Sequence, residues 1–330
     1  MAKKPKAPQF GRGKKLLLLM IILGAGYFFR NTLNVQSALT ETKYQIAGVL
    51  EGKSVDISRI FSKLTLRSAN EHRNYHGKRP AEHINGSDIG GSCALNLYEN
   101  KAPVIEIPKM AQESKIICNY AYAGRASFIS KSTLYSAEHL TKARILAAQK
   151  IERINPFHPD ERLTPSERSE LADYRGKGYD RGHLAPNADM GDAISQYQSF
   201  SLANMMPEVP EHNRKTWAEI EKETRKLALK YNNVYTVTVP VYENVNGQMP
   251  SHINTIGKNH VYIPNYIAKA IYIPELEQAV VVFTPNDASH RITLMSLARF
   301  QQIAHMDVFP TLSATIKANE GHFFHWQSVW

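Results

Sequence analysis

The clearest periodic pattern of hydrophobic and polar positions lies at residues 213–231. Apolar or small side chains recur there at three- and four-residue intervals, which is the spacing of one face of a helix. They are Trp217, Ile220, Thr224, Leu227, Ala228 and Tyr231. We therefore expect a helix at 213–231 whose apolar face packs on the core. The same period predicts a second amphipathic helix at residues 291–304.

Other apolar runs are short, rich in Val, Ile and Tyr, and predict strands. The expected strands are 116–122, 126–133, 135–140, 234–242, 261–264, 268–273 and 279–284. Residues 155–175 hold three prolines among charged side chains, which is typical of a long surface loop. This succession of elements predicts an α+β fold with a central, mostly antiparallel sheet flanked by helices. Residues 307–312 are expected to end the ordered core.

The N-terminus carries most of the charge. The formal net charge is +10, but seven of the 40 basic residues and none of the 30 acidic residues lie in the first 30 positions. The rest of the chain therefore has a net charge of only +3. Overall basicity thus indicates membrane targeting, and attraction for phosphate must come from locally placed cations.

Residues 16–29 follow this basic head and are uncharged and mostly apolar. The stretch is shorter than the roughly 20 residues of a spanning helix and is as long as a signal-peptide core. Cleavage near residues 35–38 is one alternative. If Arg30 snorkels, residues 16–33 can instead span as an uncleaved anchor. A buried core helix is a third reading. The preceding positive charge predicts export of the remaining chain.

Export bears on Cys93 and Cys118, the two cysteines of the chain. In an oxidising compartment they can form one disulfide. Two buried free thiols are the alternative. The spacing carries no zinc signature, and two cysteines alone cannot complete a structural zinc site.

The densest chemistry lies in residues 179–190. Asp180, Arg181, Gly182 and His183 place an acid, a cation, a flexible residue and a base in consecutive positions. An unperturbed imidazole titrates near pH 6.5, so His183 can serve as a neutral base at pH 7. We expect Gly182 to permit a backbone turn that aims this ring into a cleft. A lone histidine is more often a packing residue.

A second group of polar residues lies on the expected helix. Asn213 offers a neutral amide oxygen of the kind Mg²⁺ accepts, although it could simply cap the helix. Glu221, two turns on, could accept hydrogen bonds from metal-bound water. Arg225 could pair with Glu221 or approach phosphate, or the two could be an ordinary exposed pair. Together with His183 these residues favour metal-assisted phosphodiester hydrolysis.

At these residues the chain resembles the DNA/RNA non-specific endonuclease family, the ββα-metal nucleases. Residues 180–183 and the following Leu184-Ala185-Pro186 match the family signature, and residues 202–207 and 213–217 match its second block. Weaker similarity runs from about residue 116 to residue 310. The resemblance implies a ββα-metal nuclease fold, Mg²⁺ or Mn²⁺ as cofactor, and DNA and RNA as substrates cut to 5′-phosphate ends.

The resemblance also implies roles for individual residues. His183 is implied as general base, Asn213 as the direct metal ligand and Glu221 as a water-mediated support of the metal. Asn204 falls on an active-site asparagine that orients the site, and Arg181 on a contact to phosphate. An upstream arginine implied to stabilise the transition state is best matched by Arg153, with Arg162 and Arg175 as alternatives.

Two positions depart from the family pattern. Glu208 stands where the family usually has glutamine. Thr238-Val239-Pro240 replaces the usual Thr-Gly-Pro, so a close backbone approach there could be altered. Neither change removes a proposed catalytic group, but substrate preference or rate could differ.

The expected domains are a basic cytoplasmic head (1–15), a signal peptide or anchor (16–33), a stalk and N-terminal extension of unassigned role (34–112), the nuclease domain (113–317) and a tail (318–330). We expect an exported protein, anchored in the inner membrane facing the periplasm or exterior, or secreted after cleavage. Its protein partners are not predicted. The alternatives are an exported protein that binds nucleic acid without cutting it, as in DNA uptake, and a structural envelope protein with a fortuitous motif.

Overall fold

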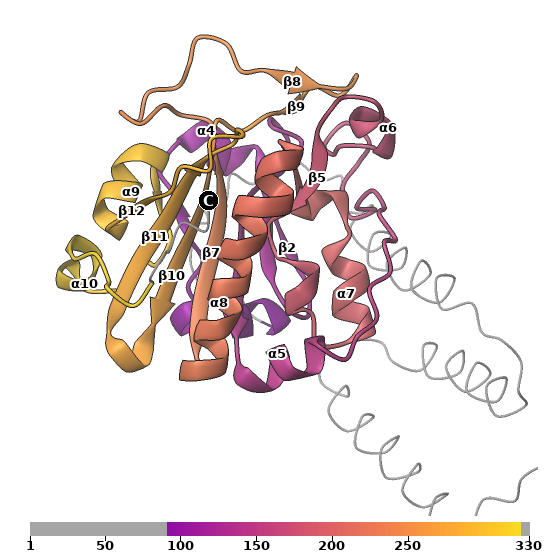
Figure 1. Ribbon diagram of the computed structural model, residues 1–330. Coiled ribbons are helices and arrows are strands. Elements are labelled where there is room, and N and C mark those ends of the chain that lie inside the picture. The colour runs from indigo at the N-terminus through magenta and orange to yellow at the C-terminus, as the bar shows by residue number, and fades with distance from the viewer. Residues whose placement is uncertain (1–90, 325–330) are drawn as a thin grey trace, which may run out of the picture. The chain divides into compact units, whose positions relative to one another are not determined.

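A seven-stranded antiparallel sheet forms the centre of the computed structural model, which describes residues 91–324 (Figure 1). Its strand order is β12-β11-β10-β7-β4-β3-β2. The bounds are β2 Ser114–Cys118, β3 Ala123–Ser127, β4 Thr133–Leu140, β7 Val234–Val241, β10 Tyr266–Ile273, β11 Gln278–Pro285 and β12 Thr293–Met295. The mixed fold with a central antiparallel sheet flanked by helices is therefore confirmed.

Both faces of the sheet are covered. Because successive side chains of a strand point to opposite faces, β10 sends Ala268, Ala270 and Tyr272 to one face and Ile267 and Ile271 to the other. We call these the α9 face and the α8 face, after the helix that packs on each. Strands buried on both faces are nearly continuous apolar runs, which explains why composition located them.

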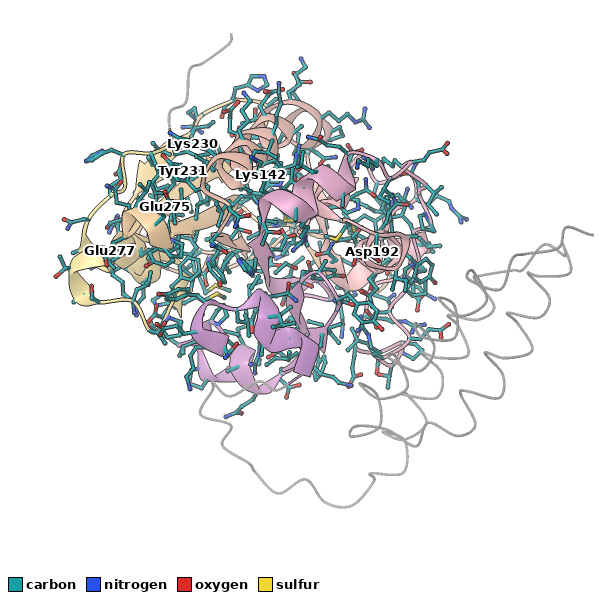
Figure 2. All side chains as sticks on the ribbon, turned by 90° about the horizontal axis from the view of Figure 1, so that it is seen from below. Lys142, Asp192, Lys230, Tyr231, Glu275 and Glu277 are labelled. Carbon is teal, nitrogen blue, oxygen red and sulfur yellow. A yellow bond between two sulfur atoms is a disulfide. The ribbon has the colours of Figure 1, made fainter. Side chains whose placement is uncertain are left out.

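The α8 face is covered by α8 (Ala218–Tyr231) and α5 (Lys142–Ala148). A π-helical turn, His212–Trp217, leads directly into α8, so the helix expected at 213–231 is confirmed. Trp217, Ile220 and Ala228 are buried in the cluster on this face. Figure 2 views the end of the sheet where α5 begins and α8 finishes, near the labelled Lys142, Lys230 and Tyr231. The start of α8 lies at the other end.

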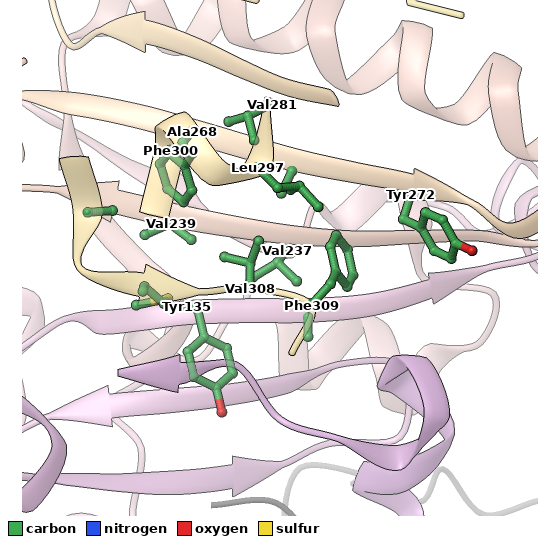
Figure 3. Close-up of a cluster of buried hydrophobic side chains, with 14 of the residues drawn as sticks. Tyr135, Val237, Val239, Ala268, Tyr272, Val281, Leu297, Phe300, Val308 and Phe309 are labelled. Atoms are coloured by element: carbon green, nitrogen blue, oxygen red, sulfur yellow. The ribbon is translucent and has the colours of Figure 1, made fainter. Parts of the chain in front are cut away.

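The α9 face is covered by α9 (Leu297–Ala304) and by the segment that follows it (Figure 3). Phe300 and Phe309 pack there against Val237 and Val281. The chain continues through β13 (Met306–Asp307) to α10 (Ala314–Ala318), beyond the expected end of the core at 312.

Residues before 113 belong to the same packed unit. The elements there are the 3-10 turns η2 (Gly91–Asn96) and η3 (Tyr98–Asn100), β1 (Val104–Ile105), which pairs with β13, and α4 (Pro108–Gln112). Leu97 and Ala102 join the core of the α9 face. Cys93 forms a disulfide with Cys118 of β2, so the segment is fastened to the edge of the sheet.

A smaller layer next to α8 carries motif residues 180–183 on a two-stranded sheet, β5 (Asp180–His183) with β6 (Met205–Glu208). Around it lie α6 (Leu171–Tyr174), η4 (Asn187–Asp189), α7 (Ala193–Ser199) and η5 (Leu202–Asn204). Two short strands, β8 (Thr255–Ile256) and β9 (Val261–Tyr262), form another pair, and η7 (Pro274–Leu276) connects β10 to β11.

Several expected elements are wrong in part. The expected strands 116–122 and 261–264 end earlier, at Cys118 and Tyr262. Of residues 126–133 only the two ends are strand, because the Ser127 hydroxyl accepts hydrogen bonds from the Ile129 and Ser130 amides and turns the chain. The helix expected at 291–304 begins only at Leu297. Ser296 caps it by accepting from the Arg299 amide, and the residues before it form β12.

The expectations for the basic head, the signal or anchor segment and the stalk up to residue 90 lie outside the described residues. The same holds for residues 325–330 of the tail. Within residues 91–324, no helix has the length and apolar character needed to span a bilayer.

Candidate active site

A cavity of about 840 Å³ opens between β5, the start of the α8 helix and the loop at residues 153–157. It brings together side chains that are far apart in the sequence. Those used below are Arg153, Phe157, Asp180, Arg181, His183, Asn187, Asn213 and Glu221. Five of the expected site residues thus share one cavity, whereas Asn204, Arg225, Arg162 and Arg175 do not line it.

Strand β5 places His183 at the cavity wall. The backbone of His183 pairs with Met205, and that of Gly182 with Met206. Gly182 has ordinary strand geometry, so the expected turn at this glycine is wrong. The reason for glycine is a close approach instead, since a Cβ atom at this position would overlap the Glu208 side chain.

The imidazole of His183 is partly buried between aromatic rings. It meets Phe200 edge-on, with ring centres 4.9 Å apart, and Phe157 lies 5.8 Å away. Its Nε2 is buried and has no hydrogen-bond partner. Burial, followed by the charges of Arg153 and Arg181, lowers the pKa of His183 to about 3. The ring is therefore neutral at pH 7 and has a nitrogen available for proton transfer.

Two arginines supply positive charge to the cavity. The Arg181 guanidinium lies 3.9 Å from the centre of the Phe157 ring, and that of Arg153 lies 5.6 Å from the centre of the Phe200 ring. Arg153 also donates to Asn155 Oδ1 over 2.9 Å. Within residues 91–324 neither guanidinium pairs with a carboxylate, so their charge can meet an anion in the cavity.

The two alternative upstream arginines are placed elsewhere. Arg162 donates to both oxygens of the buried Asp160, at 2.8 and 2.6 Å, and to the carbonyl of Cys118. It is thus committed to holding the chain together near the disulfide. Arg175 follows α6 and does not line the cavity. Of the three candidates only Arg153 reaches it.

Asn213 is oriented by Asp180. Its Nδ2 donates to Asp180 Oδ2 over 2.9 Å, and Arg214 donates to both oxygens of the same carboxylate. A carboxylate only accepts, so the amide nitrogen must face Asp180 and the amide oxygen must point away from it. Burial would raise the pKa of Asp180, but the hydrogen bonds from Arg214 and Asn213 outweigh it and hold the pKa below its usual value.

Glu221 lies on the same helix and lines the cavity. Burial raises the pKa of Glu221 to about 8, although Lys269 and Arg225 act in the opposite direction. Added positive charge nearby would favour its ionised form. The side chain is therefore suited to accept hydrogen bonds from the hydration shell of a cation.

The donor set fits a hydrated, oxygen-seeking cation. In residues 91–324 no cluster of three His, Cys, Asp or Glu residues could hold a metal. The cavity offers instead the oriented amide oxygen of Asn213, the carboxylate of Glu221 and the Asn187 Oδ1, which is buried without a partner. Mg²⁺ takes few protein ligands, prefers oxygen and keeps several waters. Asn213 would hold the ion directly.

Asn204 and Arg225 lie behind the cavity. The Asn204 side chain is buried and fully hydrogen-bonded to Ala185, Ser199 and Ser136 at 2.9–3.0 Å, which fixes the backbone just after His183. Arg225 does not pair with Glu221. Its ion pair, at 3.1 Å, is with the buried Asp189.

Sequence reasoning missed Asn187 and the partners of Asp180. Asn187 lies four residues after His183 within the same motif, so its place there was a usable signal. Asp180 is next to Arg181 in the chain, but its side chain binds Asn213 and Arg214, which are more than 30 residues away. No pattern among neighbouring residues predicts a contact between segments this far apart in the sequence.

Comparisons with known proteins agree with this arrangement. The sequence model of the DNA/RNA non-specific endonuclease family matches residues 105–314. The chain is 33% identical to the mitochondrial endonuclease G of Homo sapiens, over 51% of this chain and 56% of that protein. It is 33% identical to the mitochondrial nuclease 1 of Schizosaccharomyces pombe, over 56% and 59%, and 36% identical to the Bos taurus endonuclease G, over 36% and 40%.

The fold is also similar to a crystal structure of a complex between EndoG and EndoGI. The TM-score is 0.54 and the identity 25%, covering 61% of this chain and 88% of that one. The matches to the three relatives above span only about half of those proteins' lengths.

Proposed function

The chain belongs to the DNA/RNA non-specific endonuclease family, and from that premise we propose that it is a divalent-metal-dependent endonuclease. It hydrolyses phosphodiester bonds of DNA and RNA and leaves 5′-phosphate ends. The observation that carries the proposal is one cavity that holds both the unpaired His183 Nε2 and the oriented amide of Asn213.

His183 is the general base. Its Nε2 has no hydrogen-bond partner and can take a proton from the attacking water, and the negative charge of a bound phosphate would raise the pKa that burial, Arg153 and Arg181 lower in the empty cavity. Arg153 and Arg181 bind the phosphate and neutralise the charge that grows on its oxygens. Asn213 would hold a divalent cation, and Glu221 would accept hydrogen bonds from its water; when bound, the cation would supply Lewis acidity at the phosphate. Mg²⁺ is the proposed ion, with Mn²⁺ as a substitute.

The substrate range follows from the same chemistry. Because the nucleophile is water, no 2′-hydroxyl takes part in the reaction, and DNA and RNA are both accepted. The cations of the cavity address phosphate and not base edges, so cleavage has little sequence preference and slows as salt rises.

We also propose that the protein acts outside the cytoplasm, anchored by residues 16–33 or secreted after their removal. The Cys93–Cys118 disulfide supports this, since such bonds persist in oxidising compartments.

A plasmid-nicking assay on the full-length chain tests the proposal. Nicking is expected with Mg²⁺ and not with EDTA, and His183→Ala should lose nearly all turnover while it still binds DNA. His252→Ala, an exposed histidine outside the cavity, is the matched control and should cut normally. DNA binding without metal-dependent nicking by the wild type would favour the alternative, an exported binding protein.

A further inference from the structure

Glu208 and His212 form a buried pair next to the cavity. Glu208 is the last residue of β6 and His212 the first of the π-helical turn, and both side chains are at most 1% exposed. Glu208 Oε1 lies 2.6 Å from His212 Nδ1. His212 Nε2 lies 2.8 Å from the Thr284 hydroxyl on β11. The pair therefore connects the small sheet, the start of the helix and the large sheet.

These contacts close a ring around Asn213. Glu208 pairs with Asp180 across the β5–β6 ladder. Asp180 accepts the hydrogen bond from Asn213 Nδ2, and Asn213 follows His212 directly in the chain. The amide of Asn213 is thus held through Asp180 on one side and through the backbone of His212 on the other.

The contacts hold the His212 ring at both of its nitrogens. Thr284 donates its hydroxyl proton to the Ile267 carbonyl over 3.2 Å, so the Thr284 oxygen accepts from His212 Nε2. On the other side of the ring, Nδ1 shares one proton with Glu208 Oε1. The ring therefore cannot turn, and the backbone that leads into Asn213 is fixed with it.

The helix needs such an external support at this point. In a π-helical turn the hydrogen bonds reach one residue further back than in an α-helix, and such turns are short and irregular. The backbone amide of Asn213 donates to the Val209 carbonyl, so the helix fixes the backbone here but not the direction of the Asn213 side chain. The direction in which Asn213 points is therefore set by contacts outside the helix, of which the Glu208–His212 pair is the most buried.

We propose that Glu208 and His212 are positioning residues that aim the amide oxygen of Asn213 at the metal. The inference rests on the proposed function, because it presumes that Asn213 binds a cation. Glu208 stands where the family resemblance expects glutamine, and a glutamine at this position could also form a hydrogen bond with His212.

Mn²⁺ binding to the full-length chain, followed by electron paramagnetic resonance, tests the pair without relying on cleavage. Glu208→Met removes the group that contacts His212 Nδ1 at similar volume and should weaken Mn²⁺ binding about tenfold, the usual effect of losing a group that orients a ligand. Glu208→Gln keeps a hydrogen-bonding group at that place and should stay within about twofold of the wild type by the same reasoning. The KM for DNA, set by the arginines, should not change.

Thr284→Val provides a milder probe if Glu208→Met does not fold, because it removes only the hydroxyl that receives the His212 hydrogen bond. It should weaken Mn²⁺ binding measurably at a nearly unchanged Tm. Wild-type Mn²⁺ affinity in Glu208→Met, or in Thr284→Val where the first variant is insoluble, would overturn the positioning role and leave a packing contact.

Asn213→Ala distinguishes failure of the positioning role from failure of the proposed metal ligand. If it loses Mn²⁺ binding while Glu208→Met does not, the positioning role fails and the proposed metal ligand stands. If it binds Mn²⁺ as the wild type does, the proposed ligand itself fails, and the positioning role fails with it.

Discussion

The two faces of the central sheet are built by the same strands and differ in what they bury. On the α9 face, β4, β7, β10 and β11 contribute Tyr135, Val237, Ala270 and Val281 to a cluster of apolar side chains. On the α8 face the same strands bury Glu138, Thr238, Lys269 and Thr284 among isoleucines and valines. Only the α8 face supports the helix that carries Asn213 and Glu221. The buried polar side chains of these four strands thus lie on the face that supports the site.

The charges on the α8 face have specific partners. Glu138 accepts from Arg144 over 2.8 Å. Lys269 donates to Thr238 over 2.6 Å, and its ammonium lies 5.5 Å from the Trp217 ring. Burial raises the pKa of Glu138 to about 8, while Arg144 and Lys269 act against it. Buried ions cost desolvation energy that apolar packing would avoid. Because these charges are concentrated under α8, we infer that they help to set the electrostatic potential at the site.

Of the variants on the two faces, Asn213→Ala should have the largest effect on catalysis. Loss of the proposed metal ligand is expected to lower cleavage on the order of 10³-fold, since metal assistance contributes several kcal/mol to transition-state stabilisation. Urea unfolding should change little. Cleavage rates as a function of Mg²⁺ concentration provide the measurement, with the exposed Asn246→Ala as matched control. A normal rate with an unchanged Mg²⁺ titration would exclude Asn213 as the ligand.

Phe300→Ala on the α9 face should do the reverse. The ring is fully buried, so its loss is expected to cost about 3–5 kcal/mol of unfolding free energy. The kcat per folded molecule should stay the same, because nothing on that face reaches the cavity. Urea unfolding and cleavage well below the Tm measure the two quantities. A fall in kcat beyond the folded fraction would mean that the faces are not independent.

Lys269→Met should lower both cleavage and stability, each by less than the variants above. Removing the ammonium raises the pKa values of Glu138 and Glu221 further, because Lys269 lowers both. A group whose folded pKa lies above its unfolded value loses stabilisation as pH rises. The variant should therefore be destabilised by about 3 kcal/mol at pH 8 and less at pH 6. Urea titrations at the two pH values check this, and an equal loss at both would argue against buried acids as the cause.

The smallest effect concerns the titration of His183. With a pKa near 3, its ring protons should not shift between pH 5 and pH 8 in NMR spectra of the folded protein. In urea the same ring should titrate near pH 6.5. Because the folded pKa is the lower one, folding should lose stability as pH falls from about 6.5 toward 3. A folded-state midpoint near 6.5 would contradict the burial of this imidazole.

The elements with a strong local period were predictable from the sequence. The helix that begins beside Asn213 follows from apolar spacing, and the β7, β10 and β11 strands follow from their branched residues. The residues that the motifs single out, among them His183 and Asn213, also line one cavity. These features depend on neighbours in the chain, which a single sequence displays.

Features set by contacts between distant segments were not predictable. Lys269 lies inside an apolar run and gave no sign that it meets Thr238 and Trp217. Arg225 has Glu221 one turn away, yet the buried Asp189, 36 residues distant, is its partner. Gly182 was interpreted through backbone freedom, whereas the approach of Glu208 explains it. In each case the tertiary neighbour outweighs the local one.

The π-helical turn at His212–Trp217 makes the site sensitive to chain length in a way that ordinary mutagenesis does not probe. One residue more than a regular turn is accommodated there, and each residue of an α-helix rotates the chain by about 100°. Deleting a single residue between Asn213 and Trp217 would restore regular winding while α8 stays seated on the sheet. The amide would then swing about the helix axis out of the cavity, so an indel here would remove the proposed metal ligand from the site without unfolding the domain.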